Sequence, residues 1–309
     1  MTELKVIDLP ENKGLGNALK VSLENCKNEI VSRMDSDDVC VSNRFETQIA
    51  EFKKTDVDVV GGQIAEFIGD QTNITGIRTV KYTDSEIKRD MRKRCPMNHV
   101  SVMYRKSAVM KAGGYLDWYC NEDYYLWIRM MMSGAKFANV PDTLVNVRCG
   151  RDMSSRRGGI IYFKSEKALQ KYMLKNSIIS FPQYLYNVFI RFMGEVVAGN
   201  SLRSWLFKFT RKKSVNSDFK SEITEFDRKE KSNDMSEKGY PPFSVAMSVY
   251  AKDNSEWFDE ALSSVVNQTV KPNEIVLVVD GPIPKEIQDI IEKWKKILND
   301  GNCDGGGYY

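Results

Sequence analysis

The sequence has a single histidine, His99, among its 309 residues. A metal centre built from several histidines is therefore excluded. Cysteine is also sparse and scattered, with no Cys-x-x-Cys pair and no spacing typical of a zinc site. We expect these thiols to be reduced, as in a cytosolic protein. The cysteines are Cys26, Cys40, Cys95, Cys120, Cys149 and Cys303.

Other features that would point to particular partners are also missing. The formal net charge is only +3, so no overall field favours a nucleic acid as partner. No apolar run reaches about 18 residues, the length that suggests a membrane-spanning helix. Met1 leads through two polar residues into an expected strand, without the pattern of a signal peptide. We therefore expect a cytoplasmic protein, with 42% hydrophobic residues to build its core.

The most informative segment is Glu29–Gln48, where a short apolar strand over Ile30–Met34 runs into the acidic sequence DSDD. Clustered carboxylates repel one another and are poor strand formers, so this turn favours a bound cation. Oxygen ligands suit Mg²⁺ or Mn²⁺, which proteins often hold together with substrate phosphates. A metal-bridged nucleotide is the first interpretation. The alternative is a surface turn that caps the next helix, expected to begin near Ser42.

Hydrophobic periodicity predicts strands and helices in alternation along most of the chain. Expected strands are 4–9, 30–34, 57–60, 100–104, 137–147, 243–250 and 274–279, and expected helices include 42–53, 160–209, 256–267 and 284–296. Within the long helical region, large apolar residues such as Leu185 and Phe189 recur at helical spacing beside several cations. That face could lie on an anionic bilayer surface. The alternative is a helical pair packed on the domain.

The order of the elements is unusual. Two strand–helix pairs over 243–296, placed before residues 4–38, would give the alternation of a parallel sheet. Ligands bind such sheets outside the carboxyl ends of the strands. Those ends would be Ser248–Tyr250, Asp280, Pro10–Asn12 and Asp35–Asp38.

Several segments, taken in that rearranged order, resemble glycosyltransferase family 2 enzymes, close to bacterial capsule and exopolysaccharide transferases of the amylovoran type. The segments are FSVAMSVYAKDNSEWFDEALSSVVNQT, EIVLVVDGP, ENKGLGNAL, RMDSDD with NRFETQ, NHVSVMYRKSAVMKAGGY and NEDYYLWIRMMMSGAKF. The resemblance implies an α/β GT-A fold, a Rossmann-like and mostly parallel sheet flanked by helices. The family normally begins with the FSVAMSVY strand, so the chain is either circularly permuted or a fusion of two transferase fragments.

On this basis we expect five regions along the chain. Residues 1–159 would form the central and acceptor part of the GT-A domain, 160–213 a helical and membrane-surface extension, 214–240 a flexible linker, 241–298 the nucleotide-binding first half of the domain, and 299–309 a disordered tail.

The resemblance also implies roles for residues at the expected rim. Ser248, Tyr250 and Asp280 would hold the nucleoside, and Asn12 and Gly14 would lie beside them, although turn chemistry also explains the last two. Asp35 and Asp37 match the family's Asp-x-Asp motif: Asp37 would reach the metal, Asp35 the ribose or the metal, and Asp38 would support them. The metal would act as a Lewis acid on the departing diphosphate.

Asp123 matches the family's catalytic base and Glu122 an acceptor-orienting neighbour, with capping of a helix start as the alternative for either. His99 lies near the expected sugar-phosphate position, where a structural role is equally expected. Arg148, Arg156 and Arg157 could clamp the diphosphate, or form a solvated basic loop.

The resemblance implies an inverting, metal-dependent glycosyltransferase. It would move a hexose from a UDP- or dTDP-sugar to a saccharide acceptor, expected to be lipid-linked, at the inner face of the cell membrane during surface polysaccharide synthesis. The alternatives are a nucleotidyltransferase, and a permuted or fused chain that binds nucleotide sugar without transfer.

Overall fold

The computed structural model describes residues 2–150, 159–197 and 239–299. Its centre is a nine-stranded sheet in the order β1-β9-β8-β2-β6-β4-β7-β3, with β5 paired to β4 beside this path. The strands are β1 (Glu3–Leu9), β2 (Ile30–Met34), β3 (Val39–Cys40), β4 (Val59–Phe67), β5 (Ile74–Arg78), β6 (Met103–Arg105), β7 (Phe137–Arg148), β8 (Phe243–Val249) and β9 (Glu274–Asp280).

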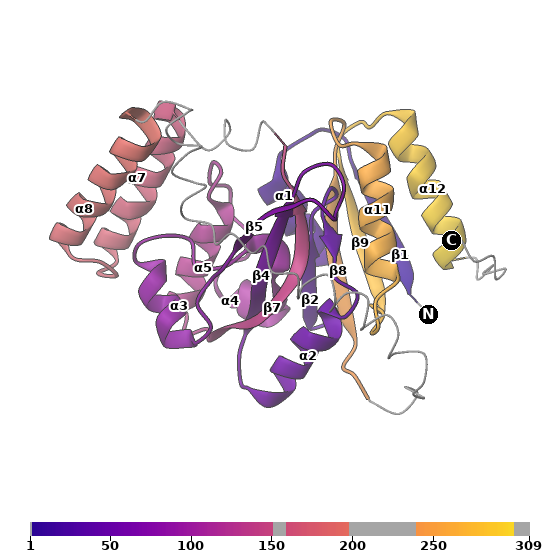
Figure 1. Ribbon diagram of the computed structural model, residues 1–309, viewed down its shortest axis with the longest axis horizontal. Helices are drawn as coiled ribbons and strands as arrows, with labels where there is room; N and C mark the ends of the chain where they lie inside the picture. Colours follow the sequence, from indigo (N-terminus) through magenta and orange to yellow (C-terminus); the bar gives the residue numbers. More distant parts are fainter. Residues whose placement is uncertain (1, 151–158, 198–238, 300–309) are drawn as a thin grey trace.

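The two strands from the end of the chain lie between the two from its beginning (Figure 1). β9 pairs in parallel with both β1 and β8, and β8 pairs in parallel with β2. All residues of β9 and β2 are buried, as expected for apolar strands in the interior of a parallel sheet. The predicted parallel sheet, formed by strands that are distant in the sequence, is confirmed.

The last described helix ends where the first strand begins. The side-chain amide of Asn299 accepts from the Leu4 backbone N–H at 2.9 Å and donates to the Leu4 carbonyl at 3.0 Å. The side chain of Thr2 donates to the Pro272 carbonyl at 2.7 Å. Residues 2–4 and 299 are therefore neighbours in space (Figure 1).

The other half of the sheet is mixed. β6 is antiparallel to both β2 and β4, and β4 is parallel to β7. The predicted strand over Val100–Tyr104 is wrong at its start, because His99–Ser101 form a 3₁₀ turn, η1. The Ser101 N–H and hydroxyl both donate to the Asn98 carbonyl, at 2.9 and 2.8 Å, and this local closure delays the strand to Met103.

Helices cover both faces of the sheet (Figure 1). They are α1 (Leu15–Asn25), α2 (Arg44–Lys54), α3 (Asp84–Met91), α4 (Lys106–Lys111), α5 (Glu122–Met132), α7 (Gly159–Lys175), α8 (Phe181–Phe192), α11 (Ser255–Val266) and α12 (Lys285–Asn299). One core cluster joins the sheet to α2, α11 and α12, and a second joins it to α1, α3, α4, α5 and α7. The expectation of an α/β fold is confirmed. β3, β5, α3 and α4 were not predicted.

The helical extension consists of α7, α8 and a short π-helical turn, η2 (Met193–Val197). Leu169 and Met173 of α7 belong to the core cluster with α5, so the pair is packed on the domain. None of the described helices is long and apolar enough to cross a membrane. The predicted linker, apart from residues 239–240, and the predicted tail after residue 299 lie outside the described residues.

Candidate active site

Four parallel strands bring their carboxyl ends to one rim of the sheet. β8 is followed by Tyr250, β9 ends at Asp280, β1 leads into the turn containing Asn12, and β2 leads into Asp35. Parallel strands point the same way, so their ends share an edge and the loops after them can face one ligand. The shared rim follows from strand pairing, whereas the roles predicted for its residues remain predictions.

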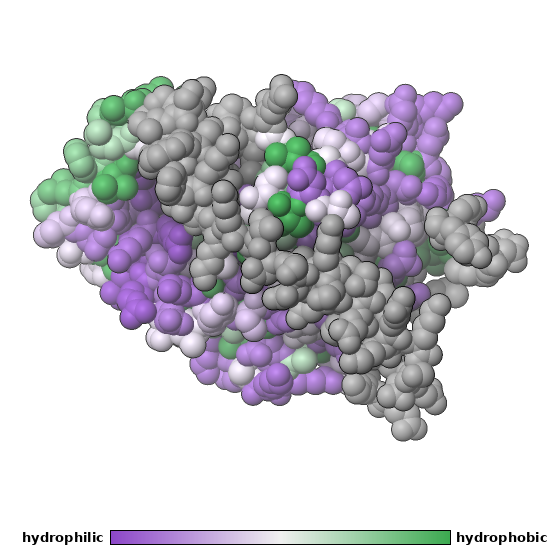
Figure 2. All heavy atoms as spheres, viewed as in Figure 1, coloured by the Kyte–Doolittle hydropathy of each residue, from purple (hydrophilic) through white to green (hydrophobic). Residues whose placement is uncertain are grey.

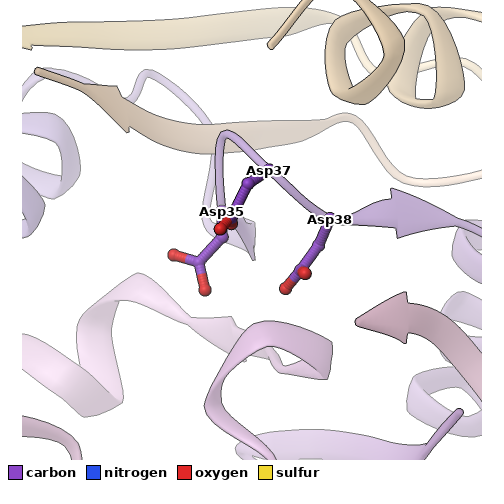
Figure 3. A group of neighbouring side chains, drawn as sticks. All are labelled: Asp35, Asp37 and Asp38. Atoms are coloured by element: carbon purple, nitrogen blue, oxygen red, sulfur yellow. The ribbon is translucent and has the colours of Figure 1, made fainter. Parts of the chain in front are cut away.

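The acidic turn after β2 gathers its carboxylates. Asp35, Asp37 and Asp38 have oxygen atoms within 4.8 Å of one another, and their side chains point to the same side of the turn (Figure 3). Three carboxylates at this spacing form an oxygen donor set that fits a hard divalent cation such as Mg²⁺ or Mn²⁺.

Burial and repulsion between carboxylates disfavour the charged forms of Asp37 and Asp38. Burial, with the neighbouring charges of Asp35 and Asp253, raises the pKa of Asp37 to about 6. Burial and the charges of Asp35 and Asp37 raise the pKa of Asp38 well above its usual range. Asp38 also accepts the Arg148 backbone N–H at 2.9 Å. A bound cation would relieve this repulsion, so the residues present fit a metal site.

A buried arginine fixes the first acid of the turn. Arg33 belongs to β2 and is only 2% exposed, and its guanidinium donates through both terminal nitrogens to the two oxygens of Asp35. This fork-shaped contact orients Asp35 and partly neutralises it. The Arg33 Nε is buried without a hydrogen-bond partner. Arg33 therefore binds both carboxylate oxygens of Asp35, whereas fewer protein groups bind the carboxylate of Asp37.

A second buried arginine secures the turn from behind. Arg44, at the start of α2, is fully buried and donates to the Arg33 carbonyl at 2.8 Å and to the Ser32 hydroxyl at 3.1 Å. Its Nε donates to Gln48 one helical turn later at 3.1 Å. These bonds attach the beginning of α2 to the end of β2, so the acidic turn between them has a fixed span.

Asp253, in the turn after β8, is a site residue that the sequence analysis missed. Its carboxylate accepts from the Ser36 hydroxyl at 2.7 Å and from the Tyr250 N–H at 3.1 Å, and so joins the β8 loop to the acidic turn. Its charge also contributes to the raised pKa of Asp37. The local signal was weak, because Asp253 precedes Asn254, which caps α11, and an acid before a helix needs no other explanation.

Asp280 holds the loop after β1. One carboxylate oxygen accepts the Lys13 N–H at 2.9 Å, and the other accepts the Gly14 N–H at 3.0 Å. Gly281 next to it has φ +86°, and a Cβ there would lie 2.6 Å from the Asn12 nitrogen. The two loops therefore touch through backbone, which explains the glycine. Ser248 and Tyr250 are half-buried on the adjoining strand end.

An acid pair begins α5. Burial, followed by the charge of Asp123, raises the pKa of Glu122 to about 7, with Asp35 adding to the rise. Asp123 accepts the Tyr124 N–H at 2.7 Å and lies 3.5 Å from the Cys95 thiol. A Cβ on Gly16, in the first turn of α1, would lie 3.8 Å from the Glu122 Cβ, so the acid pair lies beside the loop after β1.

His99 packs inside an aromatic group. Its Nε2 lies 2.9 Å from the Tyr115 hydroxyl, and its ring meets Trp127 edge-on at 5.9 Å between centroids. Burial and the nearby positive charge of Arg33 hold its pKa well below the usual range, so the ring is neutral at physiological pH. These contacts match the structural interpretation of His99.

Arg148, at the end of β7, has protein partners for every nitrogen of its guanidinium. It donates to the Asp37 carbonyl at 3.1 Å and the Gly69 carbonyl at 3.0 Å, and it pairs with Glu260. Its guanidinium lies between the rings of Phe67 and Trp257, at 4.6 and 4.8 Å from their centroids. Arg148 thus braces the acidic turn. Arg156 and Arg157, the other predicted diphosphate contacts, lie outside the described residues.

Comparison with known proteins identifies the chemistry. A sequence model described as Glycosyl transferase family 2 matches residues 2–115. The chain is 41% identical over 210 residues to an uncharacterized glycosyltransferase of Haemophilus influenzae, covering 68% of this chain and 78% of that protein. The chain belongs to glycosyltransferase family 2.

Other members of glycosyltransferase family 2 are also similar. The match to the amylovoran biosynthesis glycosyltransferase AmsE of Erwinia amylovora is 39% identical and covers 56% of this chain and 64% of that one. The match to the UDP-Gal:alpha-D-GlcNAc-diphosphoundecaprenol beta-1,3-galactosyltransferase of Escherichia coli is 33% identical and covers 66% of this chain and 74% of that one. As a family 2 member the protein is a glycosyltransferase, which removes the nucleotidyltransferase alternative.

Proposed function

We propose that this glycosyltransferase moves a hexose from a UDP- or dTDP-sugar to a lipid-linked saccharide in surface polysaccharide synthesis, with inversion at the anomeric carbon. The main support is the rim where the acidic turn after β2, the Asp253 loop and the Asp280 loop meet, with the acid pair of α5 close to the first turn of α1. The Escherichia coli relative, whose name gives a UDP-sugar donor and a diphosphoundecaprenol-linked acceptor, supports the choice of substrates.

In the proposed mechanism, an acceptor hydroxyl attacks the anomeric carbon from the face opposite the nucleotide. The new bond joins the acceptor oxygen to that carbon, the bond to the diphosphate oxygen breaks, and the diphosphate leaves with the electron pair. Asp123 takes the hydroxyl proton, and Glu122 orients the acceptor. Asp35, Asp37 and Asp38 would hold a divalent cation, which when bound supplies Lewis-acid stabilisation of the departing diphosphate. Ser248, Tyr250 and Asp280 would hold the nucleoside, beside the loop of Asn12 and Gly14.

Turnover should require both a divalent cation and the correct donor. We expect one UDP- or dTDP-sugar, incubated with Mn²⁺ or Mg²⁺ and a sugar-diphosphate-lipid acceptor, to release nucleoside diphosphate and form a glycosylated lipid. Chelation should abolish the reaction and added metal should restore it, because the acid cluster cannot stabilise a diphosphate alone. Mass spectrometry of the lipid and a nucleotide-release assay measure this. If no donor gives either turnover or a metal-dependent rise in melting temperature, the proposal fails.

We also infer that the order of the chain is a circular permutation of the family order. The family model matches residues 2–115, while β8 and β9, which complete the sheet beside β1 and β2, lie outside that match. The contacts of Asn299 with Leu4 place the end of α12 at the start of β1, where a short connection would join them.

A chain reordered as residues 239–299, a short Gly/Ser linker and residues 2–197 should therefore fold to the same sheet. We expect a melting temperature close to that of the original chain and retained donor-dependent turnover, because every strand pair is preserved and the new connection spans a short distance. Differential scanning fluorimetry and the nucleotide-release assay test this. An insoluble product, or one that no longer responds to donor and metal, would argue for a fusion of two transferase fragments instead.

A further inference from the structure

Helix α8 turns its apolar side outward. Four of its large apolar residues, at positions 181, 185, 186 and 189, have more than half of their surface exposed. Figure 2 shows apolar surface at the left of the molecule, over α7 and α8. The exposed residues of α8 and η2 are Phe181 (59%), Leu185 (51%), Tyr186 (61%), Phe189 (60%), Ile190 (49%), Phe192 (39%), Met193 (41%) and Val197 (54%). Positions 181, 185, 189, 193 and 197 follow one another at four-residue spacing and so form a continuous stripe.

The inward side of the same helix has polar residues beside Tyr184, which packs against the core. Asn187 is the one buried residue of α8, and its amide donates to Gln170 at 2.7 Å and to the Arg92 carbonyl at 2.9 Å. Arg191 pairs with Glu166 of α7 and donates to the Lys93 carbonyl at 2.9 Å. A surface helix of a water-soluble domain normally has the opposite arrangement, with apolar residues inward. Exposed contiguous apolar surface of this kind marks a binding site.

The elements that α8 packs against carry exposed cations. The turn that receives the hydrogen bonds of α8 carries three exposed basic residues, Arg92, Lys93 and Arg94, of which Arg94 pairs with Asp90 at 2.8 Å. Helix α7 adds exposed lysines at 164, 167, 171 and 175. Between Gly159 and Phe192 the single acid is Glu166, and it is buried against Arg191. The exposed charged side chains of α7 and of residues 92–94 are therefore all positive.

We propose that α8, η2 and the exposed cations of the neighbouring α7 and of residues 92–94 form a docking surface for an anionic lipid bilayer. Apolar side chains on one side and cations around them are the features of a helix that lies in the membrane interface. A second copy of the chain is a poorer occupant, because a two-fold contact across this stripe would bring the same basic turn of both copies together. The contact would hold the enzyme beside the lipid-linked acceptor, a consequence that depends on the proposed function, whereas the docking itself does not.

Vesicle flotation with the full chain, without donor or acceptor, tests the docking. The protein should float with vesicles of phosphatidylcholine and phosphatidylglycerol, should bind phosphatidylcholine alone much more weakly, and should lose binding as salt is raised. The double variant Leu185→Gln/Phe189→Gln should partition about tenfold or more weakly, since it removes two large inserting side chains. The matched control Ile68→Gln/Met110→Gln, whose side chains are 54% and 45% exposed elsewhere, should bind like the unmodified chain.

Two further measurements separate a loss of docking from a loss of folding or of catalysis. The Leu185→Gln/Phe189→Gln variant should keep its melting temperature and its transfer to a water-soluble acceptor, because neither side chain contacts the rim. The proposal is overturned if the unmodified chain does not float with anionic vesicles, or if this variant floats equally well. It is also overturned if size-exclusion with light scattering shows a dimer that the variant abolishes, since the stripe would then be a contact between copies. Loss of vesicle binding with intact transfer to the soluble acceptor supports it.

Discussion

Asp37→Asn should lower kcat/KM for sugar transfer by about 100-fold or more. Loss of even an outer-shell partner of a metal ion can cost that much, and Asp37 would be a direct ligand. Asp35 is held by Arg33 and Asp38 by the Arg148 N–H, so Asp37 has the carboxylate least committed to protein partners. Steady-state kinetics at saturating Mn²⁺ measure the effect. Asp289→Asn, on the exposed side of α12, is the matched control and should leave the rate unchanged.

The same substitution should change how stability depends on pH. The pKa of Asp37 is raised to about 6 in the folded chain from an ordinary value of 3.8, so the folded state disfavours its ionised form. In the absence of divalent cations, protonated Asp37 therefore contributes to the free energy of unfolding below about pH 4. This contribution is lost as the pH rises through about 6, where the carboxyl ionises in the folded chain. The difference in melting temperature between Asp37→Asn and the original chain should therefore grow in favour of the variant over that interval. Identical curves, together with normal turnover, would remove Asp37 from the metal site.

Asp123→Asn should lower kcat by about 10²- to 10⁴-fold, the usual contribution of a general base, while the donor dissociation constant stays unchanged. Asparagine can still accept the Tyr124 N–H that Asp123 accepts at 2.7 Å, so the start of α5 should be preserved. Kinetics and isothermal titration with a donor analogue measure the two quantities separately.

Glu122→Gln is the comparison for this test. It should lower kcat by less than about tenfold. It should also remove a pH dependence centred near 7, because the pKa of Glu122 is about 7 and its ionisation places a second charge beside Asp123. If Glu122→Gln is instead the variant that loses turnover, and Asp123→Asn remains active, the two roles are reversed.

Local patterns in the sequence predicted the elements that build the rim. The apolar run over Ile30–Met34 and the strand before Asp280 need only alternation and flanking polar residues to be recognised, and both were predicted with at most one residue of error. Short elements were harder. β3 has two residues, too few for a periodicity, and β5 alternates weakly over five. The Asn98–Ser101 turn was not predicted, because a hydrogen bond from the Ser101 hydroxyl to the Asn98 carbonyl closes it and no hydrophobic pattern marks that bond.

The site was only partly predictable for a related reason. Asp35, Asp37 and Asp38 are adjacent in the chain, so their clustering follows from the sequence. Arg33 looks like an odd charge in an apolar strand until the structure shows it buried against Asp35. Asp253 is more than 200 residues away from Ser36, with which it shares a hydrogen bond. Neither contact can be recognised from the residues that neighbour it in the sequence.

The sequence by itself determined most of the longer strands and helices, where the acids follow a strand, and the family that the motifs resemble, because these depend on neighbouring residues. Only the tertiary structure decided that β8 and β9 lie between β1 and β2, that Arg148 braces the acidic turn, and that α8 turns its apolar side outward. Strand order and burial depend on contacts between residues far apart in the chain, and burial in turn sets the pKa of Asp37 and of Glu122.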